Sequence, residues 1–264
     1  MTFFRELEER SRAIDSLVCV GLDPDYRKHR VEDIAGFLRE IIEATAPEAA
    51  CFKPNIAFFE QFGIPGLRAL EETLAAIPPG IPVIGDVKRG DIGNTAEAYA
   101  RAMFERWGFG AVTVSGYQGR DTVEPFLAYE GRGVFVLCRT SNPGSREFQE
   151  LRLANGRMLF EEVALTASAW SPDVGLVVGA TAPAELKRVC ELAPGAGLLI
   201  PGVGAQGGRA EDVVAAAGYR PGKMVVNASR GVLYASEGAD FAAAAAAAAR
   251  KLRDDLRAAA AMPA

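Results

Sequence analysis

The chain has 264 residues, 49% of them hydrophobic, so it can bury one large core, and barrels of about 250 residues form a single domain. The formal net charge of −5 and the absence of a long Lys/Arg run argue against nucleic-acid or membrane-surface binding. No segment reaches the roughly 18 to 20 unbroken apolar residues of a membrane-spanning helix, and the charged N-terminus lacks the apolar core of a secretory signal.

Short apolar runs rich in β-branched residues recur along the chain, and most are followed by a helical pattern. Several runs are apolar on both faces, which is typical of strands in a buried parallel sheet. Eight strand–helix units in about 260 residues predict a (β/α)8 barrel that forms one domain over residues 1–264, with a doubly wound open sheet as the alternative. The predicted strands lie within residues 16–23, 50–55, 82–88, 111–115, 133–140, 174–181, 198–204 and 224–230.

Two segments stand apart from this repeating pattern. The connection from Asn142 to Asp173 is longer than the others and begins "NPGSREFQELRLANGR", which predicts an exposed loop before a helix. Long loops on the working face of a barrel are often lids. The alanine-rich stretch 241–261 is low in complexity but favours helix, so we expect a terminal helix with little functional content.

The four cysteines indicate the compartment. They are widely spaced and form no CxxC or CxxH pattern. Three lie in apolar strand-like runs, where a thiol is usually a small buried hydrophobic group. We therefore expect a reduced, cytoplasmic protein without a structural metal.

Charged and polar side chains cluster where the predicted strands end, which in a barrel is the active-site face. Within "VIGDVKRGDIGNT", Asp86 and Lys88 are two residues apart on a strand, so both are expected to point to the same side. Asp91 follows in a loop flanked by glycines. Further strand-end candidates are Asp23, Lys53, Ser141 and Arg230.

This pattern of charges can serve chemistry or only stability. A lysine flanked by carboxylates is expected to stay protonated, which makes Lys88 a well-placed proton donor. The alternative is a buried ion-pair network that only stabilises the fold. Because buried charge is costly, and because these residues lie on the predicted working face, the pattern favours the functional interpretation.

A second motif pair, "PGVGAQGG" and "NASRG", predicts a phosphate site after the seventh and eighth strands. Glycines allow backbone N–H groups to approach an anion, and we expect such contacts at Gly202, Gly204, Gly207 and Gly231. Arg230 can offer a bidentate pair of N–H donors to phosphate oxygens. The alternative is two tight turns and a surface arginine.

Taken together, these motifs resemble the orotidine 5'-phosphate decarboxylase family, and most closely its longer bacterial group. The resemblance covers nearly the whole chain through "CVGLDPD", "FKPNIAFFEQFG", "VIGDVKRGDIGNTAEAYA", "TVSGYQG", "RTSNPGS", "PGVGAQGG" and "NASRG". It implies conversion of orotidine monophosphate to uridine monophosphate and carbon dioxide, without a cofactor, in pyrimidine synthesis. It also implies a homodimer whose active sites lie at the subunit interface.

The resemblance also implies roles for individual residues. Lys53, Asp86, Lys88 and Asp91 match the catalytic charged array of the family, and Asp91 and Thr95 are expected to reach in from the partner subunit. The remaining matches are to substrate-binding positions: Asp23 for a ribose hydroxyl, Ser141 for the pyrimidine amide, and Gln206 and Arg230 for the phosphate.

Two other functions remain open from the sequence. One is a sugar-phosphate synthase or decarboxylase of the same barrel superfamily, in which a carboxylate-bound magnesium is expected. The other is a non-catalytic sensor of a phosphate ligand. The intact charged array argues against a sensor, which needs no proton donor.

Overall fold

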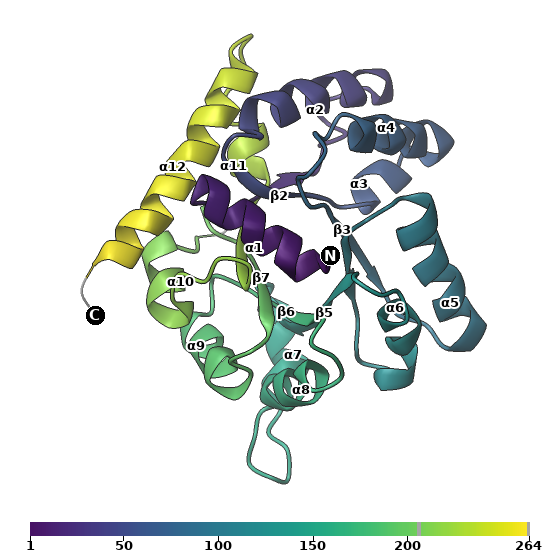
Figure 1. The fold of residues 1–264 in the computed structure, drawn as a ribbon, viewed down its shortest axis with the longest axis vertical. Coiled ribbons are helices and arrows are strands. Elements are labelled where there is room, and N and C mark those ends of the chain that lie inside the picture. Colours follow the sequence, from purple (N-terminus) through teal and green to yellow (C-terminus); the bar gives the residue numbers. More distant parts are fainter. Residues whose placement is uncertain (205–206, 263–264) are drawn as a thin grey trace.

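A single sheet of eight parallel strands, curled into a barrel, forms the centre of the molecule (Figure 1). This computed structural model describes residues 1–204 and 207–262. The strands follow the order β2-β1-β8-β7-β6-β5-β4-β3. The predicted (β/α)8 barrel is confirmed, and each strand overlaps a predicted run: β1 Val18–Leu22, β2 Ala49–Pro54, β3 Ile84–Arg89, β4 Ala111–Val114, β5 Gly133–Arg139, β6 Val174–Val178, β7 Gly197–Pro201 and β8 Met224–Ala228.

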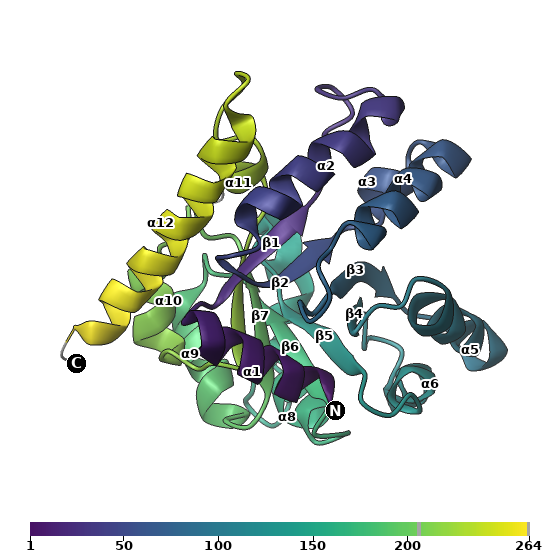
Figure 2. The ribbon, with the colours of Figure 1, turned by 45° about the horizontal axis from the view of Figure 1, so that its top comes forward.

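Helices surround the barrel on its outside (Figure 2). Helix α2 shows why: Ile34, Leu38, Ile41 and Ile42 recur at helical spacing and are fully buried against the strands. In the described part of the chain no helix is long and apolar enough to cross a membrane. The larger helices are α2 Val31–Thr45, α4 Gly63–Ala75, α5 Gly93–Arg101 with the π-helix η1 Ala102–Arg106, α8 Leu159–Ser168, α9 Pro183–Leu192 and α10 Ala210–Ala217, with the short helices α3 Ala57–Glu60, η2 Arg120–Thr122, α6 Glu124–Leu127 and α11 Arg230–Leu233.

The barrel closes at a seam between β2 and β3. In the described chain two isolated parallel bridges join them: Phe52 pairs with Val83, which directly precedes β3, and Asn55, which directly follows β2, pairs with Asp86. Every other neighbouring pair of strands is joined by a continuous or locally shifted ladder. The seam is therefore the most thinly hydrogen-bonded part of the sheet.

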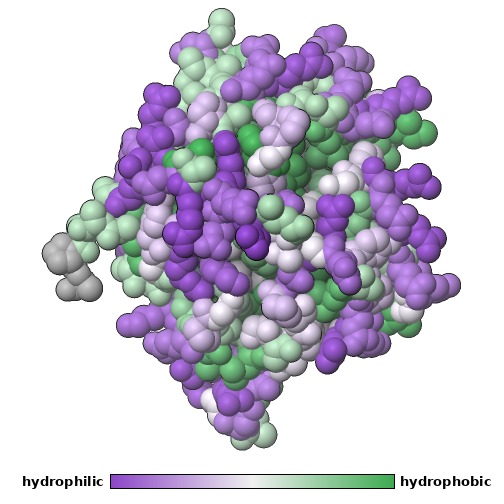
Figure 3. Space-filling view, in the orientation of Figure 1, coloured by the Kyte–Doolittle hydropathy of each residue, from purple (hydrophilic) through white to green (hydrophobic). Residues whose placement is uncertain are grey.

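Helix α1, Phe3–Ile14, covers the end of the barrel where the strands begin (Figure 1). Phe3 and Phe4 are buried there and make edge contacts with the Phe135 ring. Gly197, the first residue of β7, leaves the space that this needs, because a Cβ there would lie 2.3 Å from the Phe4 ring. The outer face of α1 is hydrophilic (Figure 3). Ligands therefore reach the barrel from its other end.

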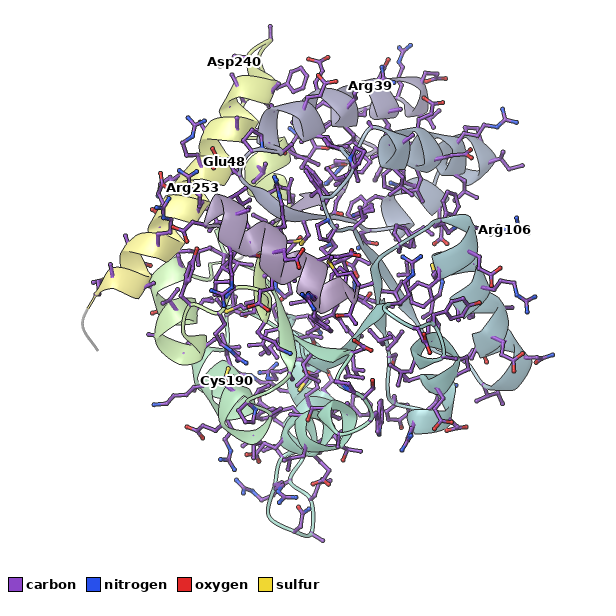
Figure 4. The ribbon with its side chains drawn as sticks, viewed as in Figure 1. Arg39, Glu48, Arg106, Cys190, Asp240 and Arg253 are labelled. Atoms are coloured by element: carbon purple, nitrogen blue, oxygen red, sulfur yellow. The ribbon has the colours of Figure 1, made fainter. Side chains whose placement is uncertain are left out.

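The C-terminal helix α12, Phe241–Ala261, lies along the outside of the barrel (Figure 1). The helix predicted from its alanine-rich sequence is confirmed. Glu48, which directly precedes β2 and is only 4% exposed, forms ion pairs with Arg250 and Arg253 of α12. Figure 4 shows Glu48 beside Arg253. Leu252 and Leu256 are buried on the inner side of this helix. The terminal helix is thus fixed to the barrel by both apolar and ionic contacts.

The long connection after β5 is more ordered than its sequence predicts. It contains the 3-10 turn η3 Pro143–Ser145 and the short helix α7 Arg146–Gln149. A bridge between Arg152 and Met158 then closes a small antiparallel turn before α8. The expectation that this segment acts as a lid stays a prediction.

Candidate active site

A cavity of about 800 Å³ opens where the strands of the barrel end. Its lining comes from the ends of most strands and from the loops that follow them. Six of the residues predicted from the sequence line it: Asp23, Lys53, Asp86, Lys88, Ser141 and Arg230. Asn55, which follows Lys53 at the end of the second predicted strand, also lines the cavity. Other lining residues were not singled out as site residues, among them Asp25, Thr113, Thr140, Asn142, Gln149, Asn227, Ser229 and Tyr234.

The Asp86 carboxylate lies between two lysine ammonium groups. Lys53 Nζ donates to Asp86 Oδ2 at 2.9 Å, and Lys88 Nζ donates to Asp86 Oδ1 at 2.5 Å. The Lys53 side chain is 4% exposed, whereas that of Lys88 is 48% exposed. Both cations line the cavity, and Lys88 is the more accessible of the two to a bound molecule.

Opposite charges keep this array ionised despite its burial. Burial raises the pKa of the Asp86 carboxyl, but Lys53 and Lys88 outweigh it and hold that pKa well below its ordinary value. Burial lowers the pKa of Lys53, but Asp23 and Asp86 outweigh it and raise that pKa above its ordinary value. At neutral pH the site therefore holds a fixed array of charges.

Lys88 reaches its position through an irregular backbone. Its φ angle is 44°, in the left-handed region that a lysine rarely adopts. The β3–β4 pairing passes from Gly85 opposite Val112 to Arg89 opposite Val114, so β3 holds extra residues that β4 does not match. Asp86 and Lys88 both line the cavity as predicted, but a local bulge places Lys88 there, not the regular alternation of a strand.

Asp23 lies beside the charged array at the end of β1. Its Oδ1 atom accepts a hydrogen bond from the Asn55 backbone N–H at 3.1 Å, which links the ends of β1 and β2. The neighbouring Asp25 N–H donates to the Tyr234 hydroxyl at 2.7 Å and so ties the β1 loop to the segment after β8. A ribose contact for Asp23 stays a prediction.

The predicted phosphate end of the site is described in part. Arg230, the first residue of α11, is exposed and lines the cavity next to Ser229. Gly202, Gly204 and Gly207 all have positive φ angles, of 104°, 77° and 91°.

The N–H groups of this glycine loop are partly engaged within it. Gly204 N–H donates to the Gly208 carbonyl at 2.9 Å, and Gly207 N–H donates to the Gly204 carbonyl at 2.8 Å. Both N–H groups thus have acceptors within the loop in this conformation, and phosphate contacts from Gly202, Gly204, Gly207 and Gly231 stay predictions. Gln206 lies outside the described residues.

Asp91 and Thr95 are placed away from the cavity of their own chain. Neither is among the described residues that line it. The Asp91 carboxylate accepts the N–H of Ile92 at 2.8 Å, and Thr95 is an exposed residue of α5. The charged array within one chain therefore consists of Lys53, Asp86 and Lys88.

The start of the β5 loop is held over the cavity by a buried arginine. Arg139, at the end of β5, donates to Glu150 at 2.6 Å and to the Ser145 hydroxyl at 2.5 Å. Gln149 accepts the N–H of Thr140 at 2.8 Å. These contacts fix the backbone on either side of Ser141, which lines the cavity.

Metal ligands are not gathered at this site. Across the described residues, no group of three or more His, Cys, Asp and Glu side chains is arranged to hold a metal ion.

Comparison with known proteins assigns the chain to a family. The model of the "Orotidine 5'-phosphate decarboxylase / HUMPS family" matches residues 16–247. The chain belongs to this family. Its relatives include the orotidine 5'-phosphate decarboxylase of Roseiflexus castenholzii, 50% identical over 98% of each chain. The enzyme of the same name from Delftia acidovorans is 47% identical over 99% of this chain and 100% of its own.

Solved structures of the family show the same barrel. The OMP decarboxylase of Leishmania donovani superposes with a TM-score of 0.88 and 42% identity, covering 100% of both chains. The UMP synthase of the same organism matches with a TM-score of 0.86 and 43% identity over 97% of this chain and 57% of its own. The similarity therefore extends over the strands and loops that build the cavity.

Proposed function

We propose that this chain decarboxylates orotidine 5'-monophosphate to uridine 5'-monophosphate and carbon dioxide, the last step of de novo UMP synthesis. The observation that carries the proposal is the Asp86 carboxylate held between Lys53 and Lys88 on the cavity wall. Full-length relatives with identities near one half carry this activity in their names. The catalytic unit is residues 1–264 as one domain.

The reaction requires the site to stabilise a carbanion. The bond between C6 of the pyrimidine and its carboxylate breaks, carbon dioxide leaves, and the electron pair stays on C6. The Lys88 ammonium, half exposed to the cavity, stabilises that charge because it is already in place before the bond breaks. Lys88 then donates a proton to C6 and regains one from solvent.

The other members of the array hold Lys88 in place. Asp86 binds the Lys88 ammonium on one side and the Lys53 ammonium on the other. These contacts keep the Lys88 side chain from turning away into solvent. Asp86 also faces the carboxylate of the bound substrate and disfavours that charge before it is lost as carbon dioxide. Both effects need an ionised Asp86, which its lowered pKa provides.

The rest of the cavity binds the substrate. Asp23 takes a ribose hydroxyl, Ser141 the pyrimidine amide, and Gln206 with Arg230 the phosphate. Binding energy from the phosphate can organise the site around the reacting carbon and so lower the barrier. No cofactor takes part in this scheme.

We further propose that two copies of the chain form a homodimer with shared sites. Asp91 and Thr95 lie outside the cavity of their own chain, in a segment whose Ile92 side chain is 60% exposed. Tyr117, in the adjacent loop after β4, is 85% exposed. Such apolar exposure supports a partner surface here, through which Asp91 and Thr95 reach the other site.

We place the protein in the cytoplasm. All four of its cysteines are described, and all are free. Burial raises the pKa of Cys138 to about 12, so this thiol stays protonated and unreactive. This pattern of four free thiols, three of them buried, supports a reducing compartment.

A spectrophotometric assay with orotidine monophosphate, with and without EDTA, tests the activity. We expect full turnover in EDTA. Loss of activity that magnesium restores would contradict the proposal and favour the sugar-phosphate chemistry considered from the sequence.

Lys88→Ala should remove nearly all turnover with an unchanged circular dichroism spectrum. Retention of more than about a tenth of the wild-type rate, a loss below about 1.4 kcal/mol of barrier, would refute the role of Lys88.

A further inference from the structure

The bulge in β3 leaves two backbone N–H groups without a hydrogen-bond acceptor on the neighbouring strand. Between Gly85 and Arg89 the chain does not pair regularly with β4, so Val87 and Lys88 cannot donate to ladder carbonyls there. Val87 is 5% exposed, and a buried N–H group without an acceptor destabilises the fold because it has lost its hydrogen bonds to water. Something other than the β4 backbone must accept these two hydrogen bonds.

The Thr113 side chain on β4 is that acceptor. Its Oγ1 atom lies 3.0 Å from the Val87 nitrogen and 3.0 Å from the Lys88 nitrogen, and it accepts from both. The same hydroxyl donates to Asp86 Oδ1 at 3.0 Å. A hydroxyl has one donor and two acceptor positions, so all three are used.

The direction of each hydrogen bond is set by its partner. The two N–H groups can only donate, and the ionised Asp86 carboxylate can only accept. Thr113 is 1% exposed, so water does not compete for its hydroxyl. One buried atom therefore joins the carboxylate of Asp86 to the backbone of the residue that carries the proposed proton donor.

This contact bears on backbone strain as well as on orientation. The left-handed conformation of Lys88 is strained for a residue with a side chain, because its Cβ atom approaches the following carbonyl oxygen. Strain of this kind persists only where the surrounding structure compensates for it. The hydrogen bond from the Lys88 N–H to Thr113 supplies that compensation at the strained residue itself.

We propose that Thr113 is a positioning residue for the decarboxylation. Its hydroxyl keeps the Lys88 backbone in the left-handed conformation and the Asp86 carboxylate in the orientation that receives both lysines. This inference rests on the proposed function for its effect on turnover, whereas its effect on the Lys88 backbone stands independently of any activity.

The test compares three variants of Thr113 with a matched control. Thr113→Val keeps the shape and removes the hydroxyl, Thr113→Ser keeps the hydroxyl, and Thr113→Ala removes hydroxyl and methyl together. The control is Thr73→Val in α4, a fully buried threonine whose hydroxyl donates only to the Ala69 carbonyl of its own helix, at 2.7 Å.

We expect Thr113→Val to lower kcat on the order of 100-fold, because the reacting groups are displaced by about 1 Å. Its affinity for uridine monophosphate should change by less than about threefold, since binding groups elsewhere in the cavity are untouched. Thr113→Ser should stay within about fivefold of the wild-type kcat, because only the rotamer preference set by the methyl group is lost. Thr73→Val should match the wild type in both.

A crystal structure of Thr113→Val gives a readout besides activity: we expect φ of Lys88 to leave the left-handed region. A wild-type kcat, or an unmoved Lys88 backbone, in Thr113→Val would overturn the proposal. If Thr113→Val does not fold, the comparison of Thr113→Ser with Thr113→Ala decides, and equal impairment of both would show that the methyl group matters and not the hydroxyl. Failure of the wild type to act on orotidine monophosphate would instead refute the proposed function and leave the structural readout valid.

Discussion

Replacement of Lys53 by methionine should destabilise the protein and do so in a pH-dependent way. Methionine keeps most of the apolar stem but removes the ammonium that lies 2.9 Å from Asp86 Oδ2. Removing one member of a buried ion pair typically costs about 3–5 kcal/mol. Asp86 keeps two of its partners, Lys88 and Thr113, so we expect the lower end of that range, about 3 kcal/mol.

The measurement is thermal or urea unfolding of the variant beside the wild type. A loss of about 3 kcal/mol corresponds to a decrease in Tm of roughly 6–12 °C for a domain of about this size. Lys251→Met is a matched control, because Lys251 pairs with Asp255 at 2.6 Å but its side chain is 74% exposed. That control should unfold with the same midpoint as the wild type within error, because solvent screens an exposed ion pair.

The dependence on pH distinguishes lost charge from lost packing. In the wild type the pKa of Asp86 is lowered, so its contribution to stability is present above the ordinary carboxyl value of about 3.9 and is lost as the pH falls through the folded value. Without Lys53, only Lys88 opposes the effect of burial, so the pKa of Asp86 rises relative to the wild type and protonation relieves a carboxylate charge that is no longer fully compensated. The deficit of Lys53→Met should therefore shrink between about pH 7 and about pH 4.

A constant deficit over that range would refute the electrostatic explanation and indicate a packing defect. So would strict additivity of Lys53→Met with Asp86→Asn. We expect the double variant to be more stable than the sum of the single changes by at least about 1 kcal/mol, because the two side chains interact directly.

Two further predictions concern binding and assembly. Arg230→Ala should weaken binding of uridine monophosphate by at least about tenfold and leave uridine nearly unchanged, since only the nucleotide carries a phosphate; equal weakening in calorimetric titrations of both would place Arg230 outside the phosphate site. Lys88→Ala and Asp91→Ala chains, unfolded together and refolded, should recover roughly a quarter of wild-type activity, because half the dimers are mixed and each mixed dimer has one intact site. No recovery after proven subunit exchange would show that Asp91 serves its own chain.

Part of this site could be predicted from the sequence because it depends only on where strands end. Lys53, Asp86 and Lys88 follow apolar runs, and the ends of parallel strands converge in any barrel. Thr113 could not be found in that way, since a threonine within "AVTVS" looks like any strand residue. Its role arises from the β3 bulge, which is a property of how two strands pair.

The role of Asp91 could not be predicted from the residues alone, for a different reason. Its sequence context shows a loop after β3 but does not show into which cavity that loop leads. The described chain places Asp91 outside the lining of its own cavity, and its contribution to the cavity of a second chain stays a proposal. The glycine loop after β7 was open to prediction as a turn, but its internal hydrogen bonds, such as Gly204 N–H to the Gly208 carbonyl, depend on its detailed conformation.

The position of the charged array on the seam of the barrel bears on how the barrel opens. Lys53 belongs to β2 and Asp86 to β3, so their ion pair crosses the junction that the sheet hydrogen-bonds most thinly. Because so few hydrogen bonds join these strands, we expect the junction to open locally before the rest of the sheet unfolds, and its amides, such as Phe52 N–H on the Pro82 carbonyl, to exchange faster than those of the other strands. A chain whose junction is open has no assembled array, so catalytic competence reports directly that the barrel is closed.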